Sequence, residues 1–270
     1  GYTLYGIKHK SVIDLSKYDI VHFHSTADMY DCRDDLKKYN GTVVLTSHSP
    51  TLLSNEYYYG LTEFEKKHMN WFYRNLIRMD EYAFNRADYI FFPCQEAEEP
   101  YYNNWDYFKT LKKKKGDRFR YLLTGIEQCK AKVDKQTIRN KYGIPENAFI
   151  ICYVGRHNEI KGYDSLKRIG QEILKYNNNI YFLIAGNESP LKGLEHSRWI
   201  EIGWTDDPHS IISASDLFLL PNKETYFDLV MLEVLSLGQI ILTTFTGGNR
   251  YFEKLKPNGI FYYNNIEEAC

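Results

Sequence analysis

Short apolar runs alternate with longer amphipathic segments along almost the whole chain. Most of the apolar runs lack polar alternation, as is typical of strands buried on both faces of a parallel sheet. Strands are expected at residues 20–24, 43–46, 89–92, 120–123, 149–154, 181–185, 217–220, 240–243 and 259–262. Helices are expected between them, at roughly residues 28–38, 62–86, 134–142, 164–176, 208–214, 228–237 and 249–255. The repeated order of strand and helix predicts an α/β fold with doubly wound parallel sheets.

The chain is long enough for two domains. Its 270 residues exceed what most single α/β domains need, and each half can bury its own core. A turn that begins at Thr124 leads into a charged segment, so the boundary is expected within residues 124–147. We predict a Rossmann-like domain over residues 1–125 and a second one over residues 126–270. The chain opens without Met and stops in an expected first helical turn, so we expect an incomplete first domain and missing last helices.

Composition and charge exclude several classes of protein. The net charge is -1, so no global field recruits nucleic acid or a membrane. No apolar stretch approaches the ~20 residues that span a bilayer. The five cysteines are scattered without a CxxC pair, which favours a reducing compartment and no structural metal. A cytoplasmic location is therefore expected.

The notable charge run is Lys112-Lys-Lys-Lys115, which follows an aromatic-rich segment from Tyr101 to Phe108. Such a run is most often a solvated loop. The alternative is a surface that contacts anionic lipid or polymer, which would place the protein at the inner face of a membrane.

The segment Tyr153-Val-Gly-Arg-His-Asn-Glu-Ile-Lys-Gly162 stands where an expected strand leads into an expected helix. Gly155 allows a tight turn at the carboxyl end of the strand, the edge at which open α/β sheets bind ligands. Arg156 and Lys161 place two cations at this edge. Gly162 allows the next helix to begin nearby, with its N-terminal amides directed into the same crevice. This combination suits a diphosphate; the alternative is that both cations only pair with surface carboxylates.

Glycines and polar residues also follow the later strands. Gly186 stands just past one strand, and the next is followed by a polar loop and an apolar helix that carries Glu233. A carboxylate on such a face is costly unless it is hydrogen-bonded, and ribose hydroxyls would satisfy it. Gly247 and Gly248 stand between a further strand and the next helix start.

Together these motifs resemble the donor-binding signature of retaining GT-B glycosyltransferases of family 4, the glycosyl transferases group 1. The resemblance is carried, in this order, by Arg156, Lys161-Gly162, Gly186, Pro221, Glu233 with Gly238, and Gly247-Gly248. The N-terminal half agrees through His22-Phe-His24, Thr46-Ser-His48, Glu81 to Asp88, and Thr124-Gly125-Ile-Glu127. The resemblance covers nearly the whole chain.

The resemblance implies two Rossmann-like domains that face each other across a cleft. A nucleotide-sugar donor, usually a UDP-sugar, would bind mainly to the C-terminal domain. A glycan, lipid-linked or protein acceptor would bind mainly to the N-terminal domain. The implied function is polysaccharide or glycoconjugate synthesis, with no cofactor and no nucleic-acid partner.

The resemblance also implies roles for individual residues. Arg156 and Lys161 would hold the diphosphate and stabilise the leaving group without a metal, His48 would face the sugar, and Glu233 would hold the ribose. The implied donor-binding residues are Gly155, Arg156, Lys161, Gly186, Glu224, Thr225, Tyr226, Phe227, Leu229, Glu233, Gly247 and Gly248.

The sequence departs from the family pattern at two positions. The family has two glutamates with seven residues between them, and the first of these contacts the transferred sugar. Counting back from Glu233, that position is Thr225, while Glu224 stands one residue away. Tyr251 replaces the acidic residue that follows the glycine pair. Either Glu224 takes over the sugar contact, or donor recognition differs, or catalysis is weak.

Other interpretations of the polar residues are weaker. His22 and His24 share one face of a strand, but no third ligand stands at a suitable spacing, so no metal site is expected. His48 lies between two serines, yet the GxSxG of hydrolases is absent, as are the GxGxxG and P-loop patterns. His157 contacts either the donor or solvent. Two further functions stay open: a non-catalytic subunit that supports a partner transferase, and a nucleotide-sugar epimerase of the same fold.

Overall fold

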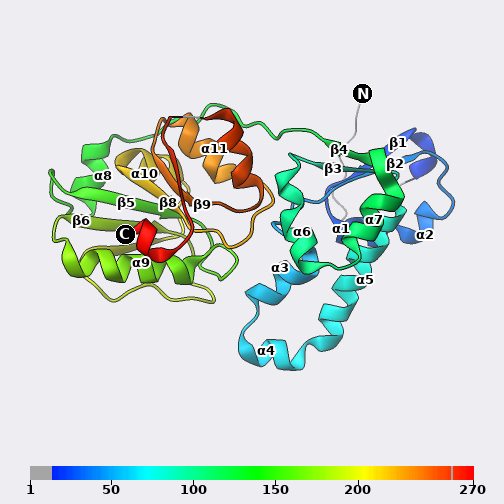
Figure 1. Cartoon of the computed structure of the whole chain (residues 1–270), viewed down its shortest axis with the longest axis horizontal. Helices are drawn as coiled ribbons and strands as arrows, with labels where there is room; N and C mark the ends of the chain where they lie inside the picture. Colours follow the sequence, from blue (N-terminus) through cyan, green and yellow to red (C-terminus); the bar gives the residue numbers. More distant parts are fainter. Residues whose placement is uncertain (1–13, 257) are drawn as a thin grey trace.

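The computed structural model describes residues 14–256 and 258–270, which form two separate parallel sheets (Figure 1). The first sheet has the order β1-β2-β3-β4, with β1 (Ile20–Phe23), β2 (Thr42–Thr46), β3 (Tyr89–Phe92) and β4 (Phe119–Tyr121). The second has the order β10-β9-β8-β5-β6-β7, with β5 (Phe149–Val154), β6 (Ile180–Ala185), β7 (Trp199–Gly203), β8 (Leu217–Leu220), β9 (Ile241–Thr244) and β10 (Ile260–Tyr263). All of these strand pairs are parallel, so the predicted fold class is confirmed. The first thirteen residues of the predicted N-terminal domain lie outside the described residues.

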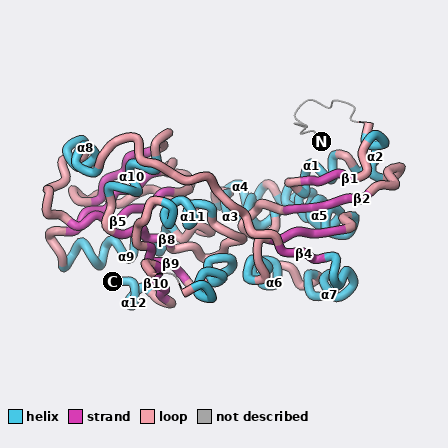
Figure 2. The backbone as a smooth tube through the Cα atoms, turned by 90° about the horizontal axis from the view of Figure 1, so that it is seen from above, coloured by secondary structure: helices cyan, strands magenta, loops and turns pink. Residues whose placement is uncertain are grey.

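The helices follow the strands in both halves. Those of the N-terminal half are α1 (Thr26–Asp31), α2 (Arg33–Leu36), α3 (Leu53–Gly60), α4 (Glu63–His68), α5 (Asn70–Arg86), α6 (Glu99–Asn104) and α7 (Phe108–Lys115). Those of the C-terminal half are α8 (Lys135–Lys141), α9 (Tyr163–Tyr176), α10 (Pro208–Ala214), α11 (Leu229–Ser236) and α12 (Ile266–Ala269). The 3₁₀ segments are η2 (Leu15–Lys17), η3 (Glu96–Glu98), η4 (Gly116–Arg118) and η5 (Gly247–Leu255). Figure 2 shows the two sheets side by side along the elongated molecule.

The second sheet is covered on both faces, which explains its apolar strands. In β5, Ile150 and Cys152 pack in the core under α10 and α11, whereas Ile151 and Tyr153 pack against α9 on the opposite face. Successive side chains of a strand point to opposite faces. Because both faces are buried, successive positions are apolar and no polar alternation remains.

The strand order of the second sheet reverses at β5. The chain adds β6 and β7 on one side of β5, and β8, β9 and β10 on the other. Open α/β sheets bind ligands outside the carboxyl ends of the strands at such a switch point. The loops after β5 and β8, residues 155–162 and 221–228, therefore frame the candidate site.

A buried carboxylate ties the helices of the N-terminal half together. Asp80 of α5 accepts hydrogen bonds from Thr26 Oγ1 at 2.8 Å and from the Ser54 amide at 3.0 Å. Burial raises the pKa of Asp80, although these hydrogen bonds act in the opposite direction. The carboxylate fixes α1, α3 and α5 to one another.

The interpretation of Lys112–Lys115 as a solvated loop is wrong. Helix α7 continues to Lys115, and two of the lysines make internal contacts. Lys112 pairs with the buried carboxylate of Glu98, and Lys115 donates to the backbone oxygen of Asn85 at 2.8 Å. Burial lowers the pKa of Lys115 to about 8. Part of this charge run therefore stabilises the fold.

The two halves are joined by an extended connection between β4 and α8, which crosses the top of the molecule in Figure 1. The predicted division after residue 125 falls within this connection and stays a prediction. Among the residues that the structure describes, no helix combines the length and the hydrophobicity needed to cross a membrane.

Candidate functional site

The loop after β5 lies directly against the loop after β8. Gly162 precedes α9 with a left-handed backbone, at a φ of 68°. A Cβ on Gly162 would stand 1.7 Å from the backbone oxygen of Pro221. Only glycine permits this approach. It holds the N-terminus of α9 at the carboxyl edge of the sheet, where backbone amides favour an anion.

Arg156 reaches across to the N-terminal half. Its Nη2 lies 2.7 Å from Oε1 of Glu56 on α3. The Arg156 side chain is 56% exposed, whereas that of Glu56 is 19% exposed. Arg156 therefore lies where the two halves meet, and a carboxylate already neutralises it.

Lys161 is neutralised from within its own half. Its Nζ lies 2.6 Å from Oδ2 of Asp228, and Asn222 Nδ2 donates to the same oxygen at 2.7 Å. Burial alone would raise the pKa of Asp228, but the Lys161 ammonium and these two hydrogen bonds lower it overall. Asp228 is therefore ionised at neutral pH and fixes Lys161 beside the start of α11.

Gly247 and Gly248 allow two backbone segments to approach. A Cβ on Gly247 would stand 1.9 Å from the backbone oxygen of Thr225, and one on Gly248 would stand 2.2 Å from that of Tyr226. The Gly248 amide donates to the Thr225 oxygen at 3.2 Å. These contacts account for both glycines without a ligand. Their predicted role as donor-binding residues stays a prediction.

The carboxylate of Glu99 on α6 accepts a hydrogen bond from the backbone amide at the start of η5. Its Oε1 accepts hydrogen bonds from the Gly247 amide at 2.9 Å and from Thr246 Oγ1 at 3.1 Å. Its other oxygen pairs with Arg250. An amide, a hydroxyl and a guanidinium thus converge on one carboxylate, so this position binds an anion.

Glu224 and Thr225 differ in what they can still bind. Glu224 Oε1 accepts a hydrogen bond from Asn104 Nδ2 at 2.7 Å, whereas its Oε2 is buried without a hydrogen-bond partner among the described residues. Burial raises the pKa of Glu224. Thr225 is buried, and the hydroxyl of Tyr226 donates to the backbone oxygen of Phe91 at 3.1 Å. Glu224 therefore keeps an acceptor oxygen without a partner among the described residues, whereas the neighbouring Thr225 is buried.

Glu233 is not the buried carboxylate that the sequence suggests. Its side chain is 30% exposed and lies 3.7 Å from His209 Nε2 of α10. Among the described residues, His209 is the ion-pair partner of Glu233, and no ion pair connects Glu233 to Lys161. Two other predicted donor-binding residues of this segment lie in different surroundings. Phe227 stacks on Phe252, whereas Leu229 is exposed.

Three histidines meet at the carboxyl ends of β1 and β2. His24 Nδ1 lies 2.8 Å from His48 Nε2, and the rings of His22 and His24 are 4.2 Å apart. A cavity of about 210 Å³ beside them is lined by His24, Ser25, Thr26, Ser47, His48, Ser49 and Leu53.

Two of these histidines, His22 and His48, are held in the neutral form. Burial, followed by the neighbouring histidines, lowers the pKa of His22 to about 4 and the pKa of His48 below its ordinary value. Neutral imidazole can accept a hydrogen bond from a hydroxyl. In the described part of the chain, no group of three or more histidine, cysteine or acidic side chains could hold a metal ion. Metal independence itself stays a prediction.

His157 is buried and does not contact solvent. Its ring stacks on Tyr163 at 3.9 Å, and neither ring nitrogen has a hydrogen-bond partner among the described residues. Its Nε2 lies 3.9 Å from Oε2 of Glu201 and would be 3.1 Å from a Cβ on Gly186. Burial lowers the pKa of His157 to about 4. A neutral histidine therefore lies next to Gly186.

Sequence reasoning missed the partners of the edge residues. Glu56, Glu99 and Asn104 come from the N-terminal half, and no local motif marks them. Asp228 could have been recognised from the sequence as a residue at the start of a helix, because acidic residues are favoured there. Its pairing with Lys161 becomes visible only in the fold.

The C-terminal half matches a known family. Residues 134–270, just over half of the chain, match the family model of the glycosyl transferases group 1. WclY, an O-antigen biosynthesis glycosyltransferase of Escherichia coli, is 27% identical over 118 residues, which are 41% of this chain and 32% of WclY. The matched segment thus spans about a third of the length of this relative.

Several solved structures share the fold. HepE of Anabaena, in complex with UDP and glucose, has a TM-score of 0.67 at 15% identity, covering 94% of this chain and 67% of HepE. Sucrose-phosphate synthase from Thermosynechococcus elongatus also has a TM-score of 0.67 at 15% identity, covering 94% of this chain and 63% of the synthase. WaaG, a glycosyltransferase involved in lipopolysaccharide biosynthesis, has a TM-score of 0.58 at 16% identity, covering 89% of this chain and 70% of WaaG.

These identities are low, so the structural likeness concerns the fold, which is the GT-B type with two Rossmann-like domains. The expected GT-B architecture is thereby confirmed. Together with the family match over residues 134–270, it identifies the chain as a member of the glycosyl transferases group 1 family.

Proposed function

We propose that the protein transfers a sugar from a nucleoside diphosphate, with UDP as the nucleotide, to a hydroxyl of a glycan or lipid-linked acceptor, retaining the anomeric configuration as family 4 does. The observation that carries this proposal is the placement of Arg156 and Lys161. Both stand on the loop after β5, at the sheet edge where Arg156 meets the N-terminal half. The UDP bound to HepE and the O-antigen role of WclY support the choice of donor and pathway class.

The proposed chemistry breaks the bond between the anomeric carbon and the diphosphate oxygen and forms one to the oxygen of the acceptor hydroxyl, whose proton passes to the departing diphosphate. Negative charge then accumulates on the departing nucleotide. Arg156 and Lys161 would stabilise this charge, a role that needs no metal. For this, the diphosphate must replace Glu56 and Asp228 as their partners.

The sugar would lie between the two halves. We assign Glu224 to its hydroxyls, because the free Oε2 of Glu224 is a buried acceptor. His48 would face the same sugar from the N-terminal half, beside the 210 Å³ cavity. Gly155 and Gly186 would border the nucleotide, and Glu233 would hold the ribose if its contact with His209 opens.

The proposal is tested with a panel of nucleotide-sugars, with release of free nucleoside diphosphate as the readout. The Lys161→Ala variant is expected to lose ~100-fold or more in turnover, as when one preorganised charge stabiliser is removed. Lys135→Ala is the matched control, because Lys135 also pairs with a carboxylate, Asp216, at 2.5 Å but lies in α8. Turnover by Lys161→Ala at the rate of this control would reject the catalytic role.

A second function is a non-catalytic subunit that supports a partner transferase. Two observations favour it: Thr225 replaces the family's sugar-contacting glutamate, and Asp228 and Glu99 occupy Lys161 and the Gly247 amide. Titration calorimetry with UDP separates the two functions. Binding of UDP favours the transferase, whereas its absence favours the subunit.

A further inference from the structure

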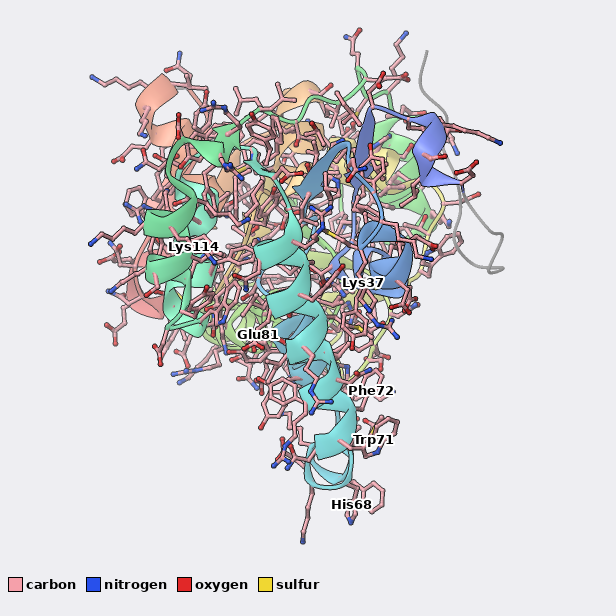
Figure 3. All side chains as sticks on the ribbon, turned by 90° about the vertical axis from the view of Figure 1, so that its right-hand side faces the viewer. Lys37, His68, Trp71, Phe72, Glu81 and Lys114 are labelled. Carbon is pink, nitrogen blue, oxygen red and sulfur yellow. The ribbon has the colours of Figure 1, made fainter. Side chains whose placement is uncertain are left out.

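Three helical segments project from the N-terminal half as an arm. The arm comprises residues 53–78, which are α3, α4 and the first half of α5, and it extends below both sheets in Figure 1. Figure 3 shows it from the side, with His68, Trp71 and Phe72 towards its free end. Its base is fixed by the buried Asp80, which accepts a hydrogen bond from the Ser54 amide. The arm is therefore anchored at its base, and its other end projects away from the N-terminal half.

The free end of the arm exposes large aromatic side chains. Phe64 and Trp71 are each 71% exposed, and Tyr57 is 49% exposed. The His68 ring stacks on Phe64 at 4.2 Å, and Phe72 packs edge-on against Tyr57 at 5.8 Å, so neighbouring rings hold one another in place. Aromatic surface gathered at one projecting end marks a contact site for another molecule.

Three cations of the arm have no partner among the described residues, whereas Lys66 and the carboxylates of the arm are engaged. The engaged acidic residues are Glu56 with Arg156, Glu63 with Lys66, and Glu65 with the amide and hydroxyl of Thr62. Lys67, Arg74 and Arg78 are exposed and have no ion-pair or hydrogen-bond partner in the described part of the chain. Trp71, Arg74 and Arg78 follow at helical spacing, so they share one face of α5.

We propose that this arm docks onto an anionic lipid bilayer. Trp71 and Phe64 would enter the boundary between headgroups and acyl chains, where amphipathic rings are favoured. Lys67, Arg74 and Arg78 would contact the anionic headgroups, whose surface potential attracts basic residues. The inference does not depend on the proposed enzymatic function.

A bilayer fits the arm better than a neutral glycan does. Exposed rings alone suit either partner, because sugars also stack on aromatic faces. Three unpartnered cations beside the rings suit an anionic surface, since a neutral glycan offers them no charge. The arm also replaces Lys112–Lys115 as the lipid-binding candidate, because Lys112 and Lys115 contact Glu98 and Asn85.

The test is flotation of the whole chain with vesicles of phosphatidylcholine alone or with phosphatidylglycerol at three to one. Wild type is expected to float with the anionic vesicles and not with the neutral ones. The charge-reversal variant Lys67→Glu/Arg74→Glu should bind at least about 30-fold more weakly, because each lost cation costs a factor of about five and the added carboxylates are repelled by the anionic surface. The Phe64→Ser/Trp71→Ser variant should bind at least about tenfold more weakly.

Matched controls carry the same substitutions elsewhere. Lys113→Glu/Lys114→Glu changes two lysines of α7, and Trp204→Ser removes an indole that is 72% exposed on the C-terminal half. Both should float like wild type, and circular dichroism checks that each variant is folded. Equal binding to neutral and anionic vesicles, loss of binding in the α7 variant only, or wild-type binding by both arm variants would overturn the proposal. Binding of a neutral polysaccharide in place of vesicles would assign the arm to a glycan instead.

Discussion

At the scale of single residues, the cations of the sheet edge already have carboxylate partners. Arg156 pairs with Glu56, and Lys161 pairs with Asp228. A nucleotide diphosphate must compete with these carboxylates for the same positive groups. The competition is strongest at Lys161, because this pair is largely removed from water and charges interact more strongly there.

The Asp228→Asn variant removes this competitor while keeping the shape of the side chain. We expect it to bind UDP about tenfold more tightly than wild type, because Lys161 no longer has an anionic partner. Titration calorimetry measures the change. Asp164→Asn is the control, since Asp164 pairs with the exposed Lys223. Weaker binding by Asp228→Asn would show instead that Asp228 positions Lys161 for the diphosphate.

His157 makes stability depend on pH. Its pKa is about 4 in the fold and 6.5 ordinarily, so between these values the unfolded chain binds more protons. Stability therefore falls as the pH decreases from about 6.5 towards 4. Burial raises the pKa of the adjacent Glu201, whose contribution has the opposite sign.

The His157→Gln variant removes the first effect and leaves that of Glu201. Between pH 7 and pH 5, we expect wild type to lose about 2 kcal/mol more stability than this variant. Urea unfolding at pH 7 and at pH 5 gives the change in the free energy of unfolding for wild type and for the variant. The expectation fails if wild type and variant lose the same stability.

At the scale of elements, continuous apolar runs were enough to predict β3, β5 and β8 with their observed bounds. β7 could not be predicted, because Glu201 interrupts its apolar pattern. The fold accommodates Glu201 through the Trp199 indole, which donates to it at 2.7 Å, and through the Tyr163 hydroxyl. Helix α3 was also missing from the prediction, since its tyrosine-rich segment depends on Asp80, more than twenty residues away.

The candidate site likewise contains residues that could be predicted from the sequence and residues that could not. Arg156 and Lys161 were predictable, because strand ends and the glycines beside them are local features of the sequence. Their partners were not, because Glu56 and Asp228 are separated from them by 100 and 67 residues. Only the folded arrangement of the halves and loops brings these charges together.

The contact between η5 and the loop after β8 depends on Gly247. Its φ is 44°, and a Cβ would clash with the Thr225 oxygen at 1.9 Å, so Gly247→Ala should cost about 3 kcal/mol or more. Gly238 has a φ of 71° but open space around it, so Gly238→Ala should cost only about 1 kcal/mol. Denaturant unfolding compares the variants. Equal losses would mean that backbone conformation, and not the close approach, requires glycine at position 247.

At the scale of the whole molecule, polar contacts and the aromatic contacts of Tyr226 with Phe92 and Tyr101 hold the two halves together. Tyr226 of the C-terminal half packs on Phe92 at 5.3 Å, and Asn104 hydrogen-bonds Glu224. Glu99 makes the densest of these contacts, because it binds the Gly247 amide, Thr246 and Arg250 together. Each half has its own sheet, so the coupling between the halves rests on a few side chains.

The Glu99→Ala variant tests this coupling. Removing the carboxylate leaves the Gly247 amide and Arg250 without their partner, so the halves should separate more easily by about 1–3 kcal/mol. Hydrogen exchange of peptides from β3 and β5 follows the two halves separately. If the halves open as one unit in wild type, both peptides share one opening free energy, and the variant should make them differ. Glu81→Ala on the exposed face of α5 is the control, and it should leave both peptides unchanged. A variant in which both peptides still exchange together, at the wild-type free energy, would place the coupling in Tyr226 and its aromatic neighbours.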